Sequence, residues 1–304
     1  MSRIFSPEFF LLFAALLWGG TFVAIKLALN SAPPFLFITI RFWIAGFVIL
    51  VLFRKSIFKK ENLKRTIWLP SFLTAISVFI GYSFQTLGLV YTSATQSGFI
   101  TGSYIIFVPI LQILFERKYP SLRTWVATFI ILIGLFFISQ NDSSFAHLFS
   151  RIRFSSGDLL TLVSAFFFAV YIIQIDYFSK KVSESGFVSF QILFTGVFAT
   201  LACPFEFYFF PKSESIRPDV FFWIGVIYTS IFATILTTKI QTRYQKAISA
   251  ARAGLLFSME PVFSYILAYL VLGETLSNIG TLGSLLVLFG VILSEMGKWN
   301  KRKD

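Results

Sequence analysis

The residue best suited to chemistry in this 304-residue chain is Glu260, which stands with Pro261 inside the apolar run 248–272. An ionised carboxylate deep in a long apolar run costs a few kcal/mol to insert into a membrane, so it should face a cavity, meet a partner or stay protonated. A carboxylate whose charged form is made costly by burial can bind and release a proton, which makes Glu260 a candidate proton-coupling site. In the structural alternative, Pro261 leaves a backbone carbonyl without its donor, and Glu260 helps to satisfy the kinked helix.

Four basic residues also lie inside apolar runs: Lys26, Arg41, Lys239 and Arg252. Arg41 stands some seven residues into the run 34–53, where it can pair with backbone carbonyls, with an acid, or with the carboxylate of a bound substrate. Lys26 and Lys239 lie nearer to the ends of their runs. Long basic side chains at such places snorkel to the lipid headgroups, and this is the interpretation we adopt for both.

Aromatic residues provide the other candidates for a binding cavity. Ligand sites are mainly apolar with a few polar groups, and aromatic residues make up 19% of this chain, so any single ring is as readily explained by packing or lipid contact. Tyr104 is the best of them because it corresponds to Glu260 in the internal repeat described below. The candidate substrate-binding residues are therefore Trp18, Arg41, Tyr82, Tyr104 and Tyr171.

Two polar pairs are candidate gates. Gln85 and Gln96 bracket the connection between the third and fourth apolar runs, and Gln241 and Arg252 bracket the equivalent connection in the second half. Two alternating gates need polar groups at equivalent places on opposite sides of a membrane, although polar residues are also common at helix ends.

Small residues four apart indicate close helix packing. Gly98 with Gly102, and Gly254 with Ser258, follow the small-xxx-small pattern that lets membrane helices approach closely. We predict a packing role for all four.

The composition excludes a soluble protein. The hydrophobic fraction is 56% and the charged fraction 13%, against roughly 25% charged residues in ordinary globular chains. A single cysteine, Cys203, excludes an internal disulfide, and a single histidine, His147, leaves metal catalysis without obvious ligands. We expect no catalytic residues, no metal and no cofactor. The net charge of +12 lies mostly in short gaps next to lipid, so we expect no nucleic-acid partner either.

The apolar runs set the architecture. A membrane helix needs about 20 apolar residues, and reading the runs between polar breaks predicts an all-α integral membrane protein with ten transmembrane helices. The predicted spans are 8–29, 34–53, 67–90, 94–115, 122–139, 157–178, 186–209, 219–242, 248–272 and 277–297.

The distribution of lysine and arginine predicts the orientation. With a cytoplasmic N-terminus, the inside segments hold 18 lysines and arginines and the outside segments hold 4. By the positive-inside rule, we expect a multi-pass protein of the cell (plasma or inner) membrane with both termini cytoplasmic.

The second half of the chain repeats the first. Because each half has an odd number of helices, the second copy must enter the membrane from the other side, which is the inverted-repeat plan of secondary transporters. The offset is 150 at first and 156 later. It pairs Glu8 with Asp158, Phe37 with Phe187, Gln85 with Gln241, Ser93 with Ser249, Ser121 with Ser277 and Gly134 with Gly290.

The chain resembles the EamA-type branch of the drug/metabolite transporter superfamily over nearly its whole length. The strongest segments are Ser249–Phe263, with Glu-Pro in mid-helix, and Leu272-Gly-Glu-Thr-Leu276; Leu17–Phe22, Arg41 and Gln241-Thr242 are also similar. Lys118 departs from the pattern, because it stands where Glu274 stands in the second half. The resemblance implies repeats at 1–142 and 157–304, the latter with a short basic cytoplasmic tail, joined by an extracytoplasmic connection at 143–156.

The same resemblance implies a function. We expect a secondary active transporter that exports an amino acid or related small metabolite by alternating access, with coupling to protons. Its expected partners are that small molecule, protons and the lipid bilayer. A membrane-embedded enzyme and a lipid-handling protein remain alternatives at this point.

Overall fold

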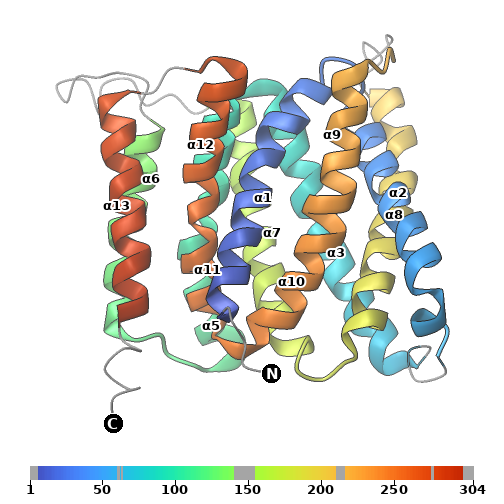
Figure 1. Ribbon diagram of the computed structural model, residues 1–304, viewed down its shortest axis with the longest axis horizontal. Helices are drawn as coiled ribbons and strands as arrows, with labels where there is room; N and C mark the ends of the chain where they lie inside the picture. Colours follow the sequence, from blue (N-terminus) through green and yellow to red (C-terminus); the bar gives the residue numbers. More distant parts are fainter. Residues whose placement is uncertain are drawn as a thin grey trace.

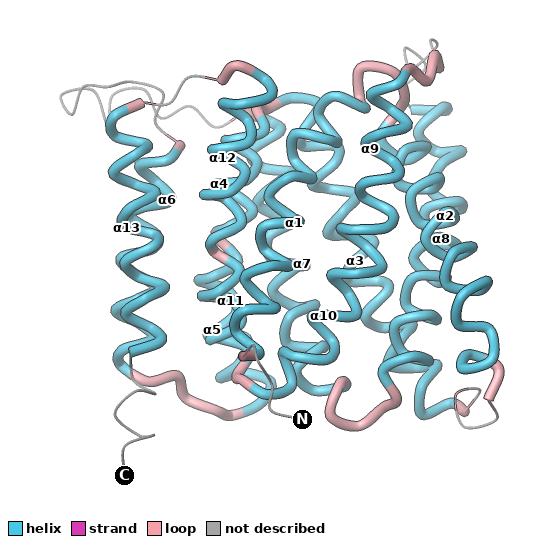
Figure 2. Tube along the Cα trace, viewed as in Figure 1, coloured by secondary structure: helices cyan, strands magenta, loops and turns pink. Residues whose placement is uncertain are grey.

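A computed structural model describes residues 6–59, 62, 64–139, 155–209, 216–274 and 277–296. The described residues form helices joined by short turns, and Figure 2 shows most of these connections at the two ends of the bundle. The first half contains α1 (Pro7–Ala28), α2 (Pro34–Ile57), α3 (Arg65–Tyr91), α4 (Ala94–Gly102), α5 (Tyr104–Glu116) and α6 (Leu122–Ile138). The second contains α7 (Ser156–Phe178), α8 (Glu184–Phe209), α9 (Val220–Ser230), a π-helical segment η2 (Ile231–Leu236), α10 (Thr237–Tyr244), a 3₁₀ turn η3 (Gln245–Ala247), α11 (Ala250–Phe257), α12 (Met259–Leu272) and α13 (Asn278–Glu295).

These elements make ten crossings of a membrane, which confirms the predicted fold class. Within the described residues, nine helical segments are long and apolar enough to span a bilayer, and α6 is a shorter apolar helix of 17 residues. Three crossings are composite. The fourth joins α4 to α5, the eighth joins α9, η2 and α10, and the ninth joins α11 to α12.

The two halves run in opposite directions through the bundle. We call the end where α1 begins and α13 ends the terminal face, and the other end the opposite face (Figure 1). Equivalent helices pack in equivalent ways: α3 lies along α7 as the α9–α10 crossing lies along α1, while α2 packs on α8 and α6 on α13. The inverted repeat expected from the sequence is therefore present in the packing.

The serines that align in the repeat are helix N-caps. Ser93 accepts a hydrogen bond from the Gln96 amide, and its counterpart Ser249 accepts one from the Arg252 amide. Ser121 and Ser277 cap α6 and α13 in the same way. A serine cap satisfies an N–H that a helix start would otherwise leave unpaired, which explains why these positions match across the halves.

Two equivalent crossings are broken near their middles. The α4–α5 crossing breaks at Ser103 and the α11–α12 crossing at Ser258, and each serine hydroxyl donates to the carbonyl three residues earlier at 2.6 Å. Pro261 follows the second break and lacks the N–H that would continue the ladder. The kink predicted at Glu260–Pro261 is thus present as a break two residues before that pair.

Glycines permit the closest helix contacts. A Cβ added at Gly102 would lie 2.7 Å from Pro261 Cγ, and one at Gly98 would lie 3.1 Å from Ser264 Oγ, so both glycines face α12. Gly254 is looser, because the nearest atom to its added Cβ lies 3.6 Å away, on Val108. Gly98 and Gly102 therefore lie in a close contact between α4 and α12, which fits the packing role that we predicted for them.

We expect Gly134→Ala to lower the thermal stability of the purified protein. A Cβ at Gly134 would lie 2.6 Å from the Gly283 carbonyl oxygen of α13, so α6 and α13 must separate, at a cost of about 1–3 kcal/mol. Gly254→Ala is the matched control because it meets no atom closer than 3.6 Å. Equal melting temperatures for the two variants in detergent would contradict this account of the α6–α13 contact.

Candidate functional site

An internal cavity lies between the two halves of the bundle. It is contributed by equivalent crossings, the first, third and fourth of one half and the sixth, eighth and ninth of the other. Its volume is about 40 Å³, which admits water but no metabolite. The lining residues are Trp18, Thr21, Val78, Tyr82, Gln85, Thr101, Tyr104, Phe168, Tyr171, Ile172, Gln241, Phe257 and Glu260.

Glu260 and Tyr104 meet across the cavity. The Tyr104 hydroxyl donates to Glu260 Oε2 at 3.5 Å, and both side chains are buried. Each residue follows the break in its crossing, so the repeat brings the two positions face to face near its axis. Among the described lining residues Glu260 is the only one with a carboxylate or a basic group. A long, single hydrogen bond leaves most of the acceptor capacity of a carboxylate open.

Arg41 stands directly behind the cavity wall. Its side chain is fully buried, and its guanidinium carbon lies 4.2 Å from the centroid of the Tyr82 ring, which lines the cavity. Arg41 Nε donates to Thr234 Oγ1 at 2.9 Å and Nη2 donates to the Ala233 carbonyl at 3.4 Å. Nη1 has no hydrogen-bond partner in the described chain. Arg41 therefore lies outside the cavity that we predicted it to line, and its Nη1 group stays without a hydrogen bond in the described chain.

The π-helical segment η2 links Arg41 to the cavity. The Ala233 carbonyl accepts from Arg41 and also from Trp18 Nε1 at 3.3 Å, and Trp18 lines the cavity. A π-helical turn widens the backbone and frees carbonyls in this way, and such turns are frequent at functional sites. The other ring predicted for the cavity, Tyr171, also lines it and accepts from Gln191 Nε2 at 3.0 Å.

Two of the four candidate gate residues line the cavity. Gln85 donates to Thr101 Oγ1 at 3.2 Å, and Gln241 donates to Gln245 Oε1 at 2.8 Å. Gln96, in the first turn of α4, and Arg252, at the terminal face, are not among the lining residues. The connections that these pairs bracket do lie at opposite faces of the bundle.

The α3–α4 turn at the opposite face is held by charged side chains. Lys26 Nζ donates to the Leu89 and Thr92 carbonyls at 2.7 and 2.8 Å, where α3 ends. The Glu274 carboxylate accepts from the Ala94 and Thr95 amides at 3.2 and 3.3 Å, where α4 begins. A cation at a helix C-terminus and an anion at an N-terminus each match the helix dipole.

Asp158 completes this arrangement by accepting from the Thr92 hydroxyl at 2.9 Å. We call the set of Lys26, Thr92, Asp158 and Glu274 the opposite-face lock. The predicted snorkelling of Lys26 is wrong, because its ammonium binds protein carbonyls instead of reaching toward headgroups. Lys239 instead lies over the Phe53 ring, 4.0 Å from its centroid.

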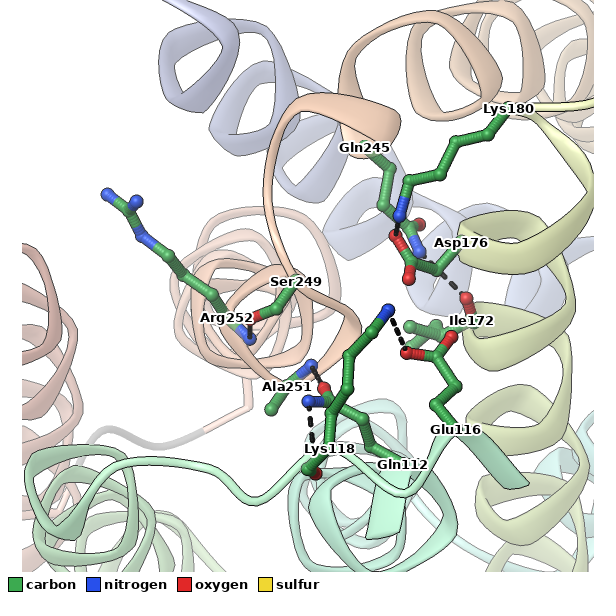
Figure 3. A network of polar contacts seen from close by, with 10 residues as sticks. All are labelled: Gln112, Glu116, Lys118, Ile172, Asp176, Lys180, Gln245, Ser249, Ala251 and Arg252. Carbon is green, nitrogen blue, oxygen red and sulfur yellow. Dashed lines mark hydrogen bonds and ion pairs between the residues drawn. The ribbon is translucent and has the colours of Figure 1, made fainter. Parts of the chain in front are cut away.

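The α10–α11 connection at the terminal face is held mainly by amides (Figure 3). Gln112 Oε1 accepts from the Ala251 amide at 2.8 Å, at the start of α11, and Gln245 Nε2 donates to the Ile172 carbonyl of α7 at 2.7 Å. Arg252 Nη2 forms an ion pair with Glu8 Oε1 of α1 at 3.3 Å. We call the set of Gln112, Gln245, Arg252 and Glu8 the terminal-face lock.

Ion pairs flank the terminal-face lock. Lys118 Nζ lies 3.0 Å from Glu116 Oε2, and Lys180 Nζ lies 2.7 Å from Asp176 Oδ1 (Figure 3). The hydrogen bond to Glu116 raises the pKa of the Lys118 ammonium, which lies beyond the end of its span. At the repeat offsets, Asp176 corresponds to Lys26 and Lys118 to Glu274, so the two ends of the bundle carry opposite charges at equivalent places.

Sequence reasoning named one residue of the two locks, Arg252, as a candidate gate and missed the other residues. Their partners are mostly backbone carbonyls and amides of distant segments, which leave no local motif; the only available signal was the charge reversal between Lys118 and Glu274 at one repeat position. Within the described residues, no three His, Cys, Asp or Glu side chains gather as a possible metal site. His147 and most of the connection 143–156 lie outside the described residues.

The comparisons with known proteins agree with this geometry. A model described as the EamA-like transporter family matches residues 5–140 and 155–296. An uncharacterized transporter of Archaeoglobus fulgidus is 32% identical over 282 residues, which are 93% of this chain and 83% of the relative. The uncharacterized transporter YetK of Bacillus subtilis is 24% identical over 92% of this chain and 84% of its own. One solved crystal structure, 18% identical, shares the fold with a TM-score of 0.74 and 95% coverage of both chains.

Proposed function

Because the chain belongs to the EamA-like transporter family, we propose that it is a secondary active exporter of an amino acid or related small metabolite. The solute crosses by alternating access, and Glu260 couples its movement to protons. The protein resides in the cell membrane with the terminal face toward the cytoplasm.

The observation that carries this proposal is a small cavity between the two halves with a different lock at each end. Equivalent crossings of the two inverted halves surround the cavity. In an inverted repeat, each half can adopt the conformation of the other half. Release of one lock would therefore open the cavity to one side of the membrane, and release of the other lock would open it to the opposite side. The small volume of about 40 Å³ fits the closed state between these two.

Glu260 supports proton coupling through its place in the cavity. It faces the space that a solute would occupy and makes one long hydrogen bond, to Tyr104. A proton and a cationic group of the solute cannot both occupy the same carboxylate, so binding of one displaces the other. Arg41, with its unused Nη1 behind Tyr82, is the group that would bind a solute carboxylate once the Tyr82 ring moves aside.

The proposal is tested by a metabolite-resolved efflux screen in cells with and without the protein. We expect one class of small metabolite to accumulate outside the expressing cells, and purified protein in vesicles to move the same compound in the direction opposite to the proton flow that an imposed gradient drives. Chemical conversion of a compound without net movement across the vesicle membrane would instead identify an enzyme.

A further inference from the structure

A second hollow in the bundle lies on its outside, separate from the cavity. It is a groove with a volume of about 490 Å³, formed by α1, the α11–α12 crossing and α13. The groove is bounded by apolar side chains along most of its length and by charged ones at one end. Its lining residues are Glu8, Leu12, Leu256, Met259, Phe263, Leu288, Val291, Ile292, Glu295 and Met296.

The groove is short enough to lie within one leaflet of the membrane. On α13 it runs from Leu288 to Glu295, a rise of about 10 Å, within the roughly 15 Å of hydrocarbon in half a bilayer. Its charged end lies at the terminal face, where α1 begins and α13 ends (Figure 1). The apolar part therefore starts at the headgroup level and extends toward the middle of the membrane.

We propose that this groove binds one acyl chain of a membrane phospholipid, with the headgroup at Glu8, Arg252 and Glu295. Water is a poor occupant of the groove, because the apolar part of the groove offers no hydrogen-bond partners. An empty space of this size would deprive the surrounding side chains of packing contacts. At this depth of a bilayer the available molecule is a hydrocarbon chain.

The methionines support an adaptable hydrocarbon site. Apart from Met1, the chain has two methionines, Met259 and Met296, and both line the groove. Methionine is unbranched and polarizable, so it packs against partners of variable shape. Acyl chains differ in length and unsaturation, which is the variation that such a wall accommodates.

The charged end of the groove matches a phospholipid headgroup. Arg252 pairs with both Glu8 and Glu295 there, so one cation and two carboxylates lie together. A headgroup that carries a phosphate and an ammonium presents the complementary charges, the phosphate to Arg252 and the ammonium to the carboxylates.

The bound chain would support the helix break that forms part of the cavity. Leu256, Met259 and Phe263 face the groove, whereas Phe257 and Glu260, on the same crossing, face the cavity. The acyl chain thus packs on the back of the break at Ser258. This makes the lipid a structural ligand of the crossing that carries Glu260.

The site is tested with the full-length protein in phosphatidylethanolamine–phosphatidylglycerol vesicles that contain a phospholipid with a photoactivatable group in its acyl chain. We expect crosslinks at Leu12 and Phe263, which line the groove and are half-buried, so that a chain inside the groove contacts them. Crosslinks confined to exposed outer residues such as Leu285, with none at Leu12 or Phe263, would overturn the proposal.

A second experiment uses native mass spectrometry of protein extracted in mild detergent. Leu288→Trp fills the groove, whereas Leu285→Trp adds the same ring to α13 outside the lining. We expect a retained phospholipid on the unmodified protein and on Leu285→Trp, and at least a several-fold loss on Leu288→Trp. Equal retention by both variants would refute the site. Neither readout depends on transport, so the lipid site and the proposed function can fail separately.

Discussion

Glu260→Gln should abolish the pH dependence of transport and slow it severely once the solute is identified. An amide has nearly the shape of a carboxylate but cannot exchange a proton, so the cavity would lose its only ionisable carboxylate among the described lining residues. Coupling free energies between two ligands are typically 1–3 kcal/mol, so proton-driven accumulation should fall by roughly 5- to 150-fold. The measurement is solute uptake into vesicles over a series of imposed pH gradients.

Glu206→Gln is the matched control for that experiment. Glu206 is also a buried carboxylate in a membrane-spanning helix, but it accepts from the Phe35 amide at the start of α2, away from the cavity. We expect Glu206→Gln to keep the pH dependence of the unmodified protein, even if its rate changes. A Glu260→Gln variant that transports normally with unchanged pH dependence would remove Glu260 from the coupling mechanism.

Breaking one lock should open the cavity toward the face where that lock lies. Glu274→Ala removes the acceptor of the Ala94 and Thr95 amides at the opposite face, and Gln112→Ala removes the acceptor of the Ala251 amide at the terminal face. Hydrogen bonds to charged groups are worth about 1.5–3 kcal/mol, so Glu274→Ala should shift the equilibrium between states by about 10- to 150-fold. Gln112→Ala removes a hydrogen bond between neutral groups, so it should shift this equilibrium less.

The reporter is a cysteine at Val78, which lines the cavity and makes no hydrogen bond through its side chain. Cys203, the single native cysteine, is first replaced by serine. A membrane-impermeant thiol reagent should then label Val78→Cys faster from the opposite face in Glu274→Ala, and faster from the terminal face in Gln112→Ala. Acceleration from the same face in both variants would show that these contacts do not act as separate locks.

The sequence predicted the fold in detail because each crossing carries its own signal. Apolar length alone defined ten spans, and the serines that the repeat aligned are the N-caps of their helices in the structure. The break at Ser103 and the π-helical segment η2 were harder to foresee. They depend on side chains and carbonyls of neighbouring helices, such as Trp18 against Ala233, and not on local composition.

The candidate site was partly predictable for a geometric reason. The repeat alignment matched Tyr104 to Glu260, and positions matched in this way approach each other where they lie near the symmetry axis, as these two do at 3.5 Å. Arg41 was misplaced, because a sequence gives its depth in a helix but not the ring of Tyr82 that separates it from the cavity. Lys26 and Glu274 could not be paired with the α3–α4 turn, since their partners are backbone groups.

The most direct test concerns the movement of the cavity between the two sides of the membrane. In vesicles of fixed orientation, the Val78→Cys protein is exposed to an impermeant thiol reagent from one side at a time, with and without the transported solute. Alternating access predicts labelling from both sides, with the solute changing the ratio of the two rates. Labelling from one side alone under every condition of solute and pH would contradict it.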